Sequence, residues 1–185
     1  QNGIRRAIGV TAMDPFQVEA HSFLRKLRLS GRSVIEMSKK HRYAMDFRFA
    51  PQIEFHEGVF RALDMHPYLV PKTNFLMVDL PLGILTDESV RDLAYLIQKQ
   101  RICPIICHIE RHILLDEKSS LERLLGISNA YFLLSSTSLV FRNVVDVMLR
   151  AIRTGKRFLL ASNAHNSTTR RPLYSIEEMN AGDAH

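Results

Sequence analysis

The sequence has little cysteine, glycine and proline, and each shortage excludes a class of protein. Its two cysteines, Cys103 and Cys107, lie in the segment "ICPIIC", within one predicted strand. Two cysteines are too few for a disulfide framework or a structural zinc site, and they indicate a reducing, cytoplasmic location. The eight glycines and seven prolines are too few for a fibrous or disordered chain.

Long apolar runs are also missing. No run approaches the ~20 residues that a membrane helix needs, so we expect a soluble protein without a membrane span. The sequence begins at Gln1, close to a predicted strand, and shows no signal-peptide pattern. We expect that a native N-terminal strand precedes it.

Positive charge exceeds negative charge, which favours anionic partners. The 25 Lys and Arg residues and 19 Asp and Glu residues give a formal net charge of +6 and a pI near 9.6. The positive charge is dispersed over segments such as "RKLRLSGR" and "RTGKR", and no RNA-binding signature or zinc-finger spacing accompanies it. We therefore expect phosphate groups or acidic peptides as partners, and no nucleic acid.

Strand patterns and helix patterns alternate along the chain. The segment 86–100 is typical of a helix, with Asp87 and Glu88 in its first turn and apolar residues at helical spacing. Strands are predicted over residues 5–12, 44–55, 73–81, 102–109, 130–136 and 157–162, and helices over 15–30, 33–42, 56–65, 86–100, 118–127 and 142–156. The alternation predicts an α/β fold with a parallel sheet, either open or closed toward a (β/α) barrel, in a single domain over residues 1–185.

Several predicted strands end in side chains that bind metal ions. Parallel strands place their carboxyl ends on one face, and in α/β proteins that face carries the active site. Carboxylate and imidazole groups suit Mn, Zn or Fe. The predicted metal ligands are Glu54, Asp79, His108, Asn163 and His165.

Arginines near two of these strand ends favour a phosphate ligand. Arg111 follows His108 by three residues, and Arg170 and Arg171 follow His165. A guanidinium group binds phosphate oxygens through paired hydrogen bonds. Arg111, Arg170 and Arg171 are therefore candidates for phosphate binding.

Each of these residues also has a structural explanation. His108 is able to cap a loop carbonyl, Asp79 to cap the following turn, Glu54 to pair with Arg48, and Asn163 to form a turn. Arg111 is able to form an ion pair with Glu110 or Asp116, and Arg170 and Arg171, in "TTRRP", are also typical of a solvated basic turn. The coincidence of four strand ends with ligand-type side chains favours a site. Dinucleotide-binding, P-loop and serine-hydrolase motifs do not occur.

The segments "CPIICHIERH" and "FLLASNAHNSTTRRP" resemble a known family. They are similar to the late motifs "PIIAHIERY" and "IASDAHN...RPP" of the bacterial tyrosine phosphatases of capsular and exopolysaccharide biosynthesis, in the polymerase-and-histidinol-phosphatase (PHP) superfamily. Upstream, "APQIEFHEGV", "NFLMVDLP" and "YFLLSSTSL" resemble further motifs of that family. The resemblance covers residues 50–175.

The resemblance implies a fold, a cofactor and a substrate. It implies an incomplete (β/α) barrel that holds up to three metal ions, usually Mn²⁺, with Zn²⁺, Fe²⁺ or Mg²⁺ as alternatives, and a metal-activated hydroxide that attacks phosphorus. Glu54, Asp79, His108 and His165 then bind metal, and Arg111 and Arg171 hold the phosphate. The implied partner is a phosphotyrosine protein, an autophosphorylating tyrosine kinase that governs surface-polysaccharide assembly.

The sequence departs from the family pattern at several ligand positions. The H-x-H pair of the family's first strand has no counterpart here. Met13 stands where the second strand supplies a histidine, with Asp14 and His21 as candidate replacements. Asn163 replaces an aspartate, and Asp79 replaces a glutamate. Incomplete metal loading and reduced or absent activity are therefore expected.

Two other functions stay open at this point. One is a non-catalytic phosphopeptide-binding module on the same fold, and the other is a small-molecule phosphoesterase similar to histidinol phosphatases. A missing first strand leaves an exposed sheet edge, which indicates a homo-oligomer.

Overall fold

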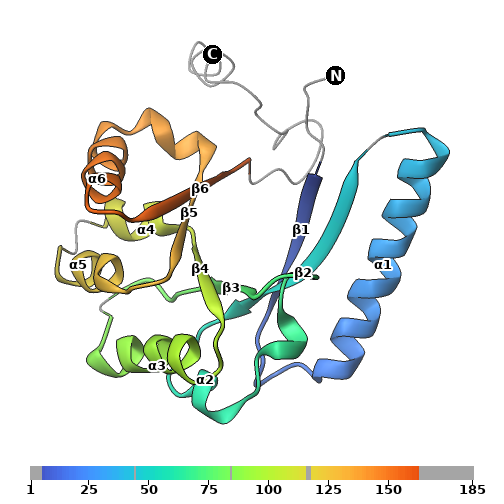
Figure 1. Cartoon of the computed structure of the whole chain (residues 1–185), viewed down its shortest axis with the longest axis horizontal. Helices are drawn as coiled ribbons and strands as arrows, with labels where there is room; N and C mark the ends of the chain where they lie inside the picture. The colour runs from blue at the N-terminus through green and yellow to red at the C-terminus, as the bar shows by residue number, and fades with distance from the viewer. Residues whose placement is uncertain (1–5, 44, 84, 116–117, 163–185) are drawn as a thin grey trace. The chain divides into compact units, whose positions relative to one another are not determined.

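The computed structural model describes residues 6–43, 45–83, 85–115 and 118–162 (Figure 1). The strands follow one another in chain order within a six-stranded sheet, and every pairing with an assigned register is parallel. This arrangement confirms the predicted α/β class. The elements are β1 (Arg6–Met13), α1 (Ala20–Lys40), β2 (Asp46–Glu54), α2 (Val59–Ala62), η1 (His66–Tyr68), β3 (Phe75–Asp79), α3 (Asp87–Gln98), β4 (Cys103–Cys107), α4 (Ile109–Leu114), α5 (Lys118–Gly126), β5 (Tyr131–Ser135), η2 (Ser136–Val140), α6 (Arg142–Arg153) and β6 (Arg157–Ala161).

The chain forms two compact units. The first consists of residues 1–81 and 91–104, and the second of residues 82–90 and 105–185. Strands β1 to β3 belong to the first unit, and β5 and β6 belong to the second. The single-domain organisation stays a prediction.

The strand register of the first unit separates a core face from a polar face. β1 pairs with β2 from Arg6 opposite Asp46 to Met13 opposite Ile53. Met13 and Ile53 are buried in the core. In the pairing of β2 with β3, Ile53 lies opposite Val78, which is also buried. Because side chains alternate along a strand, the residues that flank these positions point to the other face.

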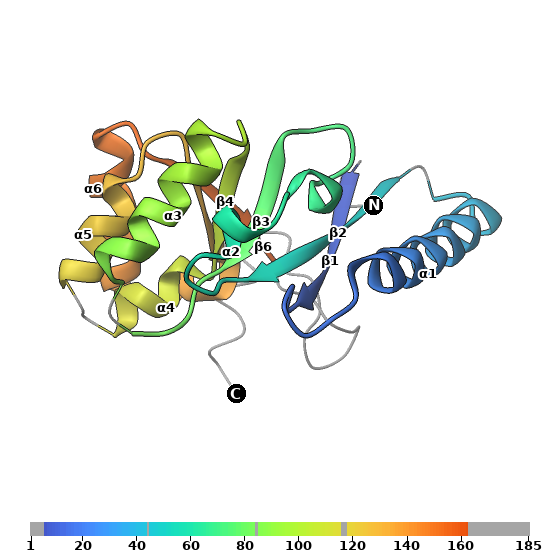
Figure 2. The same ribbon diagram turned by 90° about the horizontal axis from the view of Figure 1, so that it is seen from below.

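Helix α1 is one continuous helix, although two helical segments are predicted over residues 15–30 and 33–42. It begins at a cap in which Glu19 accepts the backbone N–H groups of His21 and Ser22, at 2.8 and 2.6 Å. Figures 1 and 2 show it without interruption beside β2, against which it packs.

The packing of α1 depends on a ring that lies between two glycines. A Cβ atom added at Gly31 of α1 would lie 2.6 Å from Phe49 Cδ2, and one added at Gly9 of β1 would lie 2.8 Å from Phe49 Cδ1. The helix therefore continues through Gly31 because the missing side chain lets it approach the ring of Phe49. Local helix propensity alone disfavours a glycine there.

Buried polar side chains fix the loops of the first unit. Asp92 is fully buried and accepts the N–H of Phe60 at 3.4 Å and Arg61 Nε at 3.1 Å. Gln100 accepts the N–H of Met65 at 2.8 Å and donates to the carbonyl oxygens of Phe60 and Leu63. These bonds attach the segment after β2 to α3, through Asp92, and to Gln100, which follows α3.

The second unit continues the parallel pattern. β5 pairs with β6 from Tyr131 opposite Arg157 to Ser135 opposite Ala161, and β4 pairs with β5 at Ile105 and Ile106. The predicted strand over 102–109 ends at Cys107, because His108 turns the chain into α4. Within the described residues, no helix combines the length and the apolar character that a membrane crossing requires.

We expect Gly31→Ala to lower the free energy of unfolding by about 1 kcal/mol, measured by chemical denaturation. The overpacking against Phe49 outweighs the gain in helix propensity. Gly126→Ala, at the end of α5, is the matched control, since a Cβ there meets nothing within 4 Å. That control is expected to be as stable as the wild type or more so. Equal or greater stability of Gly31→Ala would contradict the close approach.

Candidate metal centre

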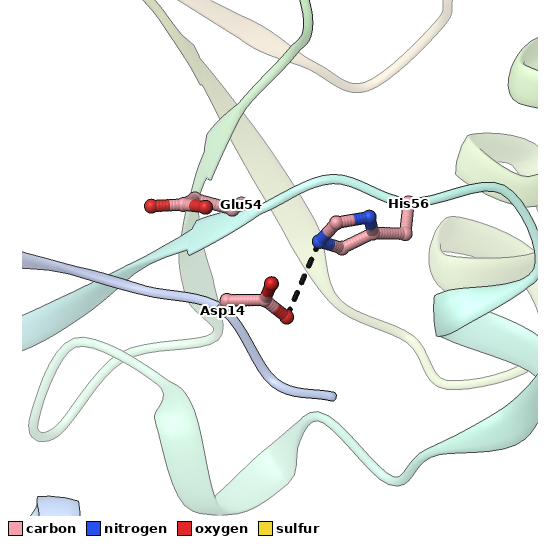
Figure 3. A group of neighbouring side chains, drawn as sticks. All are labelled: Asp14, Glu54 and His56. Atoms are coloured by element: carbon pink, nitrogen blue, oxygen red, sulfur yellow. Dashed lines mark ion pairs between the residues drawn. The ribbon is translucent and has the colours of Figure 1, made fainter. Parts of the chain in front are cut away.

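Three potential metal ligands meet at the carboxyl ends of β1 and β2. Asp14, Glu54 and His56 each offer one ligand atom, and these atoms all lie within 4.8 Å of one another. Figure 3 shows the three side chains, with Asp14 following β1 and His56 following β2. Two carboxylates and an imidazole are a donor set that suits Mn²⁺, Zn²⁺ or Fe²⁺.

The turn after β1 holds the Asp14 carboxylate in place. Asp14 Oδ1 accepts the backbone N–H of Phe16 at 2.9 Å and that of Gln17 at 3.3 Å. The N–H of Val18 donates to the Asp14 carbonyl at 3.1 Å and closes the turn. An aspartate side chain that bonds to the backbone two residues ahead is a common device in such turns. Here it fixes a carboxylate directly after Met13, the buried last residue of β1.

The segment after β2 places His56. The N–H of Phe55 donates to the Asp79 carbonyl at 2.9 Å, so the ladder between β2 and β3 extends beyond Glu54. The N–H of Val59 then donates to the His56 carbonyl at 3.0 Å, and Gly58 has a φ of 84°. This sharp turn starts α2 and leaves the imidazole beside the end of β1.

The imidazole of His56 contacts Asp14 without a well-aligned hydrogen bond. Nε2 lies 3.2 Å from Asp14 Oδ1, within ion-pair distance. Among the described residues, no group makes a correctly oriented hydrogen bond to this buried nitrogen. A divalent cation between the imidazole and the carboxylates would satisfy the nitrogen, so the residues present fit a metal ion.

The two predicted ligands of the first unit have different surroundings. Glu54 is exposed and belongs to the three-residue cluster. Asp79 is its register partner on β3, but its Oδ2 accepts Gln52 Nε2 at 2.8 Å, and it is not part of that cluster. In a parallel pair, register partners point to the same face. Glu54, Asp79 and Gln52 therefore share the polar face of the sheet.

The second unit holds His108 and Arg111. His108 has a φ of 56°, in the left-handed region that non-glycine residues adopt rarely, and its Nδ1 lies 3.5 Å from Glu110 Oε1. Metal-binding histidines commonly direct one ring nitrogen at a carboxylate, which leaves the other nitrogen for the metal. Arg111 is exposed on α4. That His108 and Arg111 share one site with Glu54 and Asp79 stays a prediction.

Opposing effects act on the pKa of Glu110. Burial alone would raise it, but the hydrogen bond with His108 and those from the N–H groups of Glu110 and Ser135 outweigh burial and lower the pKa. The Ser135 N–H lies 3.3 Å from Oε2. Glu110 is therefore a buried carboxylate that stays ionised.

Three predicted residues, Asn163, His165 and Arg171, lie outside the described residues. Their roles stay predictions.

Two residues of the cluster are not among the ligands predicted from the strand ends. The sequence indicates Asp14 only as a candidate replacement for the missing histidine, and it does not indicate His56 as a ligand. Met13, the residue aligned with that histidine, is buried in the core, while Asp14 contributes to the cluster. The available signal was the position of Asp14 directly after a strand. His21, the other candidate replacement, is exposed in α1 and is not in the cluster.

Comparisons with known proteins identify the fold. No family model matches the sequence, and no curated protein matches it. The structure is similar to one from the crystal structures of YwqE from Bacillus subtilis and CpsB from Streptococcus pneumoniae, which are metal-dependent tyrosine phosphatases. The TM-score is 0.69 at 18% sequence identity, and the match covers 92% of this chain and 69% of that chain. The chain thus has their fold, which confirms the predicted incomplete (β/α) barrel.

We expect Asp14→Asn to weaken Mn²⁺ binding at least about tenfold in calorimetric titration, because the cluster loses a charged ligand. Asparagine keeps an oxygen that accepts the N–H groups of the turn, so the fold is retained. Asp64→Asn is the matched control. Asp64 forms a second carboxylate–imidazole pair in the same unit, with its Oδ1 2.6 Å from His66 Nδ1. Mn²⁺ binding that is weakened equally in both variants, or in neither, would contradict the assignment of Asp14 as a metal ligand.

The contact between His108 and Glu110 predicts a dependence of stability on pH. A carboxylate whose pKa is lowered by folding stabilises the native state above its unfolded pKa, here 4.5, and this contribution is lost as the pH falls through the folded pKa. We expect the wild type to be more stable than Glu110→Gln by about 1–2 kcal/mol at pH 7. The difference should shrink below pH 4.5. A difference that is constant in denaturation experiments from pH 7 to pH 3 would show that Glu110 is not held ionised.

Proposed function

We propose that this chain is a metal-dependent phosphatase that hydrolyses phosphotyrosine in proteins. One observation carries the proposal. Two carboxylates and an imidazole meet at the carboxyl ends of β1 and β2, in a chain with the fold of metal-dependent tyrosine phosphatases. In parallel α/β folds this end of the strands is where active sites form.

The proposed centre uses residues of the first unit to hold a cation. Asp14, Glu54 and His56 bind a divalent ion, for which we propose Mn²⁺, and Asp79 lies on the same face of the sheet. A bound divalent ion polarises phosphoryl oxygens and lowers the pKa of a water ligand. The chain's own contribution is to fix the ligands before substrate arrives, through the turn bonds to Asp14 and the turn after His56.

The remaining predicted residues complete the proposal. His108, with Glu110 on its Nδ1, and His165 are further metal ligands, together with the weaker ligand Asn163. Arg111 and Arg171 bind phosphate oxygens, since arginine provides paired donors of fixed charge. In the reaction, water attacks phosphorus and the bond between phosphorus and the tyrosyl oxygen breaks. A proton passes to that oxygen, and the products are tyrosine and inorganic phosphate.

The proposed natural substrate is an autophosphorylating tyrosine kinase of capsular or exopolysaccharide biosynthesis, and the proposed location is the cytoplasm. This part rests on the sequence resemblance. The net charge of +6 suits a phosphorylated, anionic partner. Because Met13 and Asn163 replace ligands of the family pattern, we propose a low turnover rate. We also propose a homo-oligomer.

We expect Mn²⁺-dependent hydrolysis of p-nitrophenyl phosphate and of a phosphotyrosine peptide, abolished by a chelator. Glu54→Gln should lower kcat/KM about a hundredfold or more, because the centre loses several kcal/mol of electrostatic stabilisation. Asp64→Asn is the control and should retain wild-type kinetics.

The alternatives give different results in the same assays. Phosphopeptide binding without turnover at saturating Mn²⁺, lost in Arg111→Ala, would replace the enzyme with a binding module. Rapid hydrolysis of histidinol phosphate with phosphopeptides left intact would indicate a small-molecule phosphoesterase.

A further inference from the structure

An exposed aromatic ring lies beside the candidate metal centre. Phe16, in the turn between β1 and α1, is 55% exposed. Its ring centroid is 5.6 Å from that of His56, and the two rings are inclined at 60°. A single exposed apolar side chain is common and indicates nothing by itself. The position of this ring is informative because it contacts a residue of the cluster.

The same carboxylate that belongs to the centre also fixes Phe16. The backbone N–H of Phe16 donates to Asp14 Oδ1 at 2.9 Å, and this oxygen lies 3.2 Å from His56 Nε2. The backbone of Phe16 is thereby anchored on one side and its ring is supported by the imidazole on the other. The ring is held next to the centre by two contacts, and more than half of its surface is free to receive another group.

The chemistry of phosphate esters determines which group suits this ring. In an aryl phosphate the ester oxygen is bonded directly to an aromatic ring, so a ring must lie close to any centre that binds the phosphoryl group. In phosphoserine a methylene group occupies that place. Aromatic rings pack with their centroids about 4.5–7 Å apart, and such pairs are stabilising beyond the area they bury.

We propose that Phe16 is a substrate-contacting residue that packs against the ring of an aryl phosphate and so selects phosphotyrosine over phosphoserine. The inference rests on the proposed phosphatase function of the Asp14, Glu54 and His56 cluster and assigns the substrate selectivity of that site to one residue. The selectivity comes from the ring of Phe16, while the cluster binds the phosphoryl group of either substrate.

The test compares two peptides of one sequence that differ only in phosphotyrosine or phosphoserine. The ratio of their kcat/KM values is measured with Mn²⁺ for the full chain, for Phe16→Ala and for Phe16→Tyr. We expect Phe16→Ala to lower the ratio about threefold to tenfold, the size of an aromatic pair contact, through KM. Phe16→Tyr keeps a ring and should keep the ratio.

A binding measurement separates this inference from the proposed function. The phosphotyrosine residue is replaced by its non-hydrolysable phosphonomethyl-phenylalanine analogue, and affinity is measured by calorimetry with Mn²⁺. If no phosphoester is hydrolysed but this peptide binds about threefold to tenfold more weakly to Phe16→Ala, the proposed function fails and the role of Phe16 stands. If the peptide does not bind to the wild type, the inference is overturned.

Tyr43→Ala is the matched control. Tyr43 is also an exposed aromatic residue that stacks on a histidine, with its ring centroid 6.0 Å from that of His41. It precedes β2, at the end of the strand opposite the cluster, and should leave the ratio at the wild-type value. A ratio that stays unchanged in Phe16→Ala would overturn the inference, whether kcat/KM falls equally for both peptides or for neither.

Discussion

The parallel register between β1 and β2 is the constraint on which the candidate centre depends. It pairs Met13 with Ile53 in the core, so that the residues immediately after them emerge together at the carboxyl ends of the strands. Asp14 and Glu54 meet for this reason. A shift of one residue in either strand would move a buried apolar side chain to the polar face and an acidic side chain into the core, which is energetically prohibitive.

A single carboxylate connects the fold to the proposed chemistry. Asp14 closes the turn that leads into α1, contacts His56 and anchors the backbone of Phe16. Its position therefore combines a structural role with its proposed role as a ligand. Two backbone hydrogen bonds hold Oδ1 of this carboxylate in place before a cation or substrate arrives, which is what a preorganised site requires.

The second unit repeats this principle with different residues. His108 ends β4 and begins α4, and its left-handed backbone turns the chain so that Glu110 lies beside its imidazole. Glu110 also accepts the N–H of Ser135, at the end of β5. In both units an imidazole that follows a strand lies within ion-pair distance of a carboxylate that also bonds to the backbone. A carboxylate beside one ring nitrogen, as at His108, is typical of metal-binding histidines.

The alternation of strands and helices and the α/β class are predictable from the sequence, because they follow from local periodicity and from the geometry of parallel sheets. Glu54 is a predicted ligand for the same reason, and it belongs to the cluster with Asp14 and His56. The continuity of α1 and the composition of the cluster depend on tertiary contacts. Helix α1 continues through Gly31 only because Phe49 fills the space, and Asp14, His56 and Phe16 come together only through strand register and turn geometry. Such contacts join residues that are distant in sequence, so no local pattern records them.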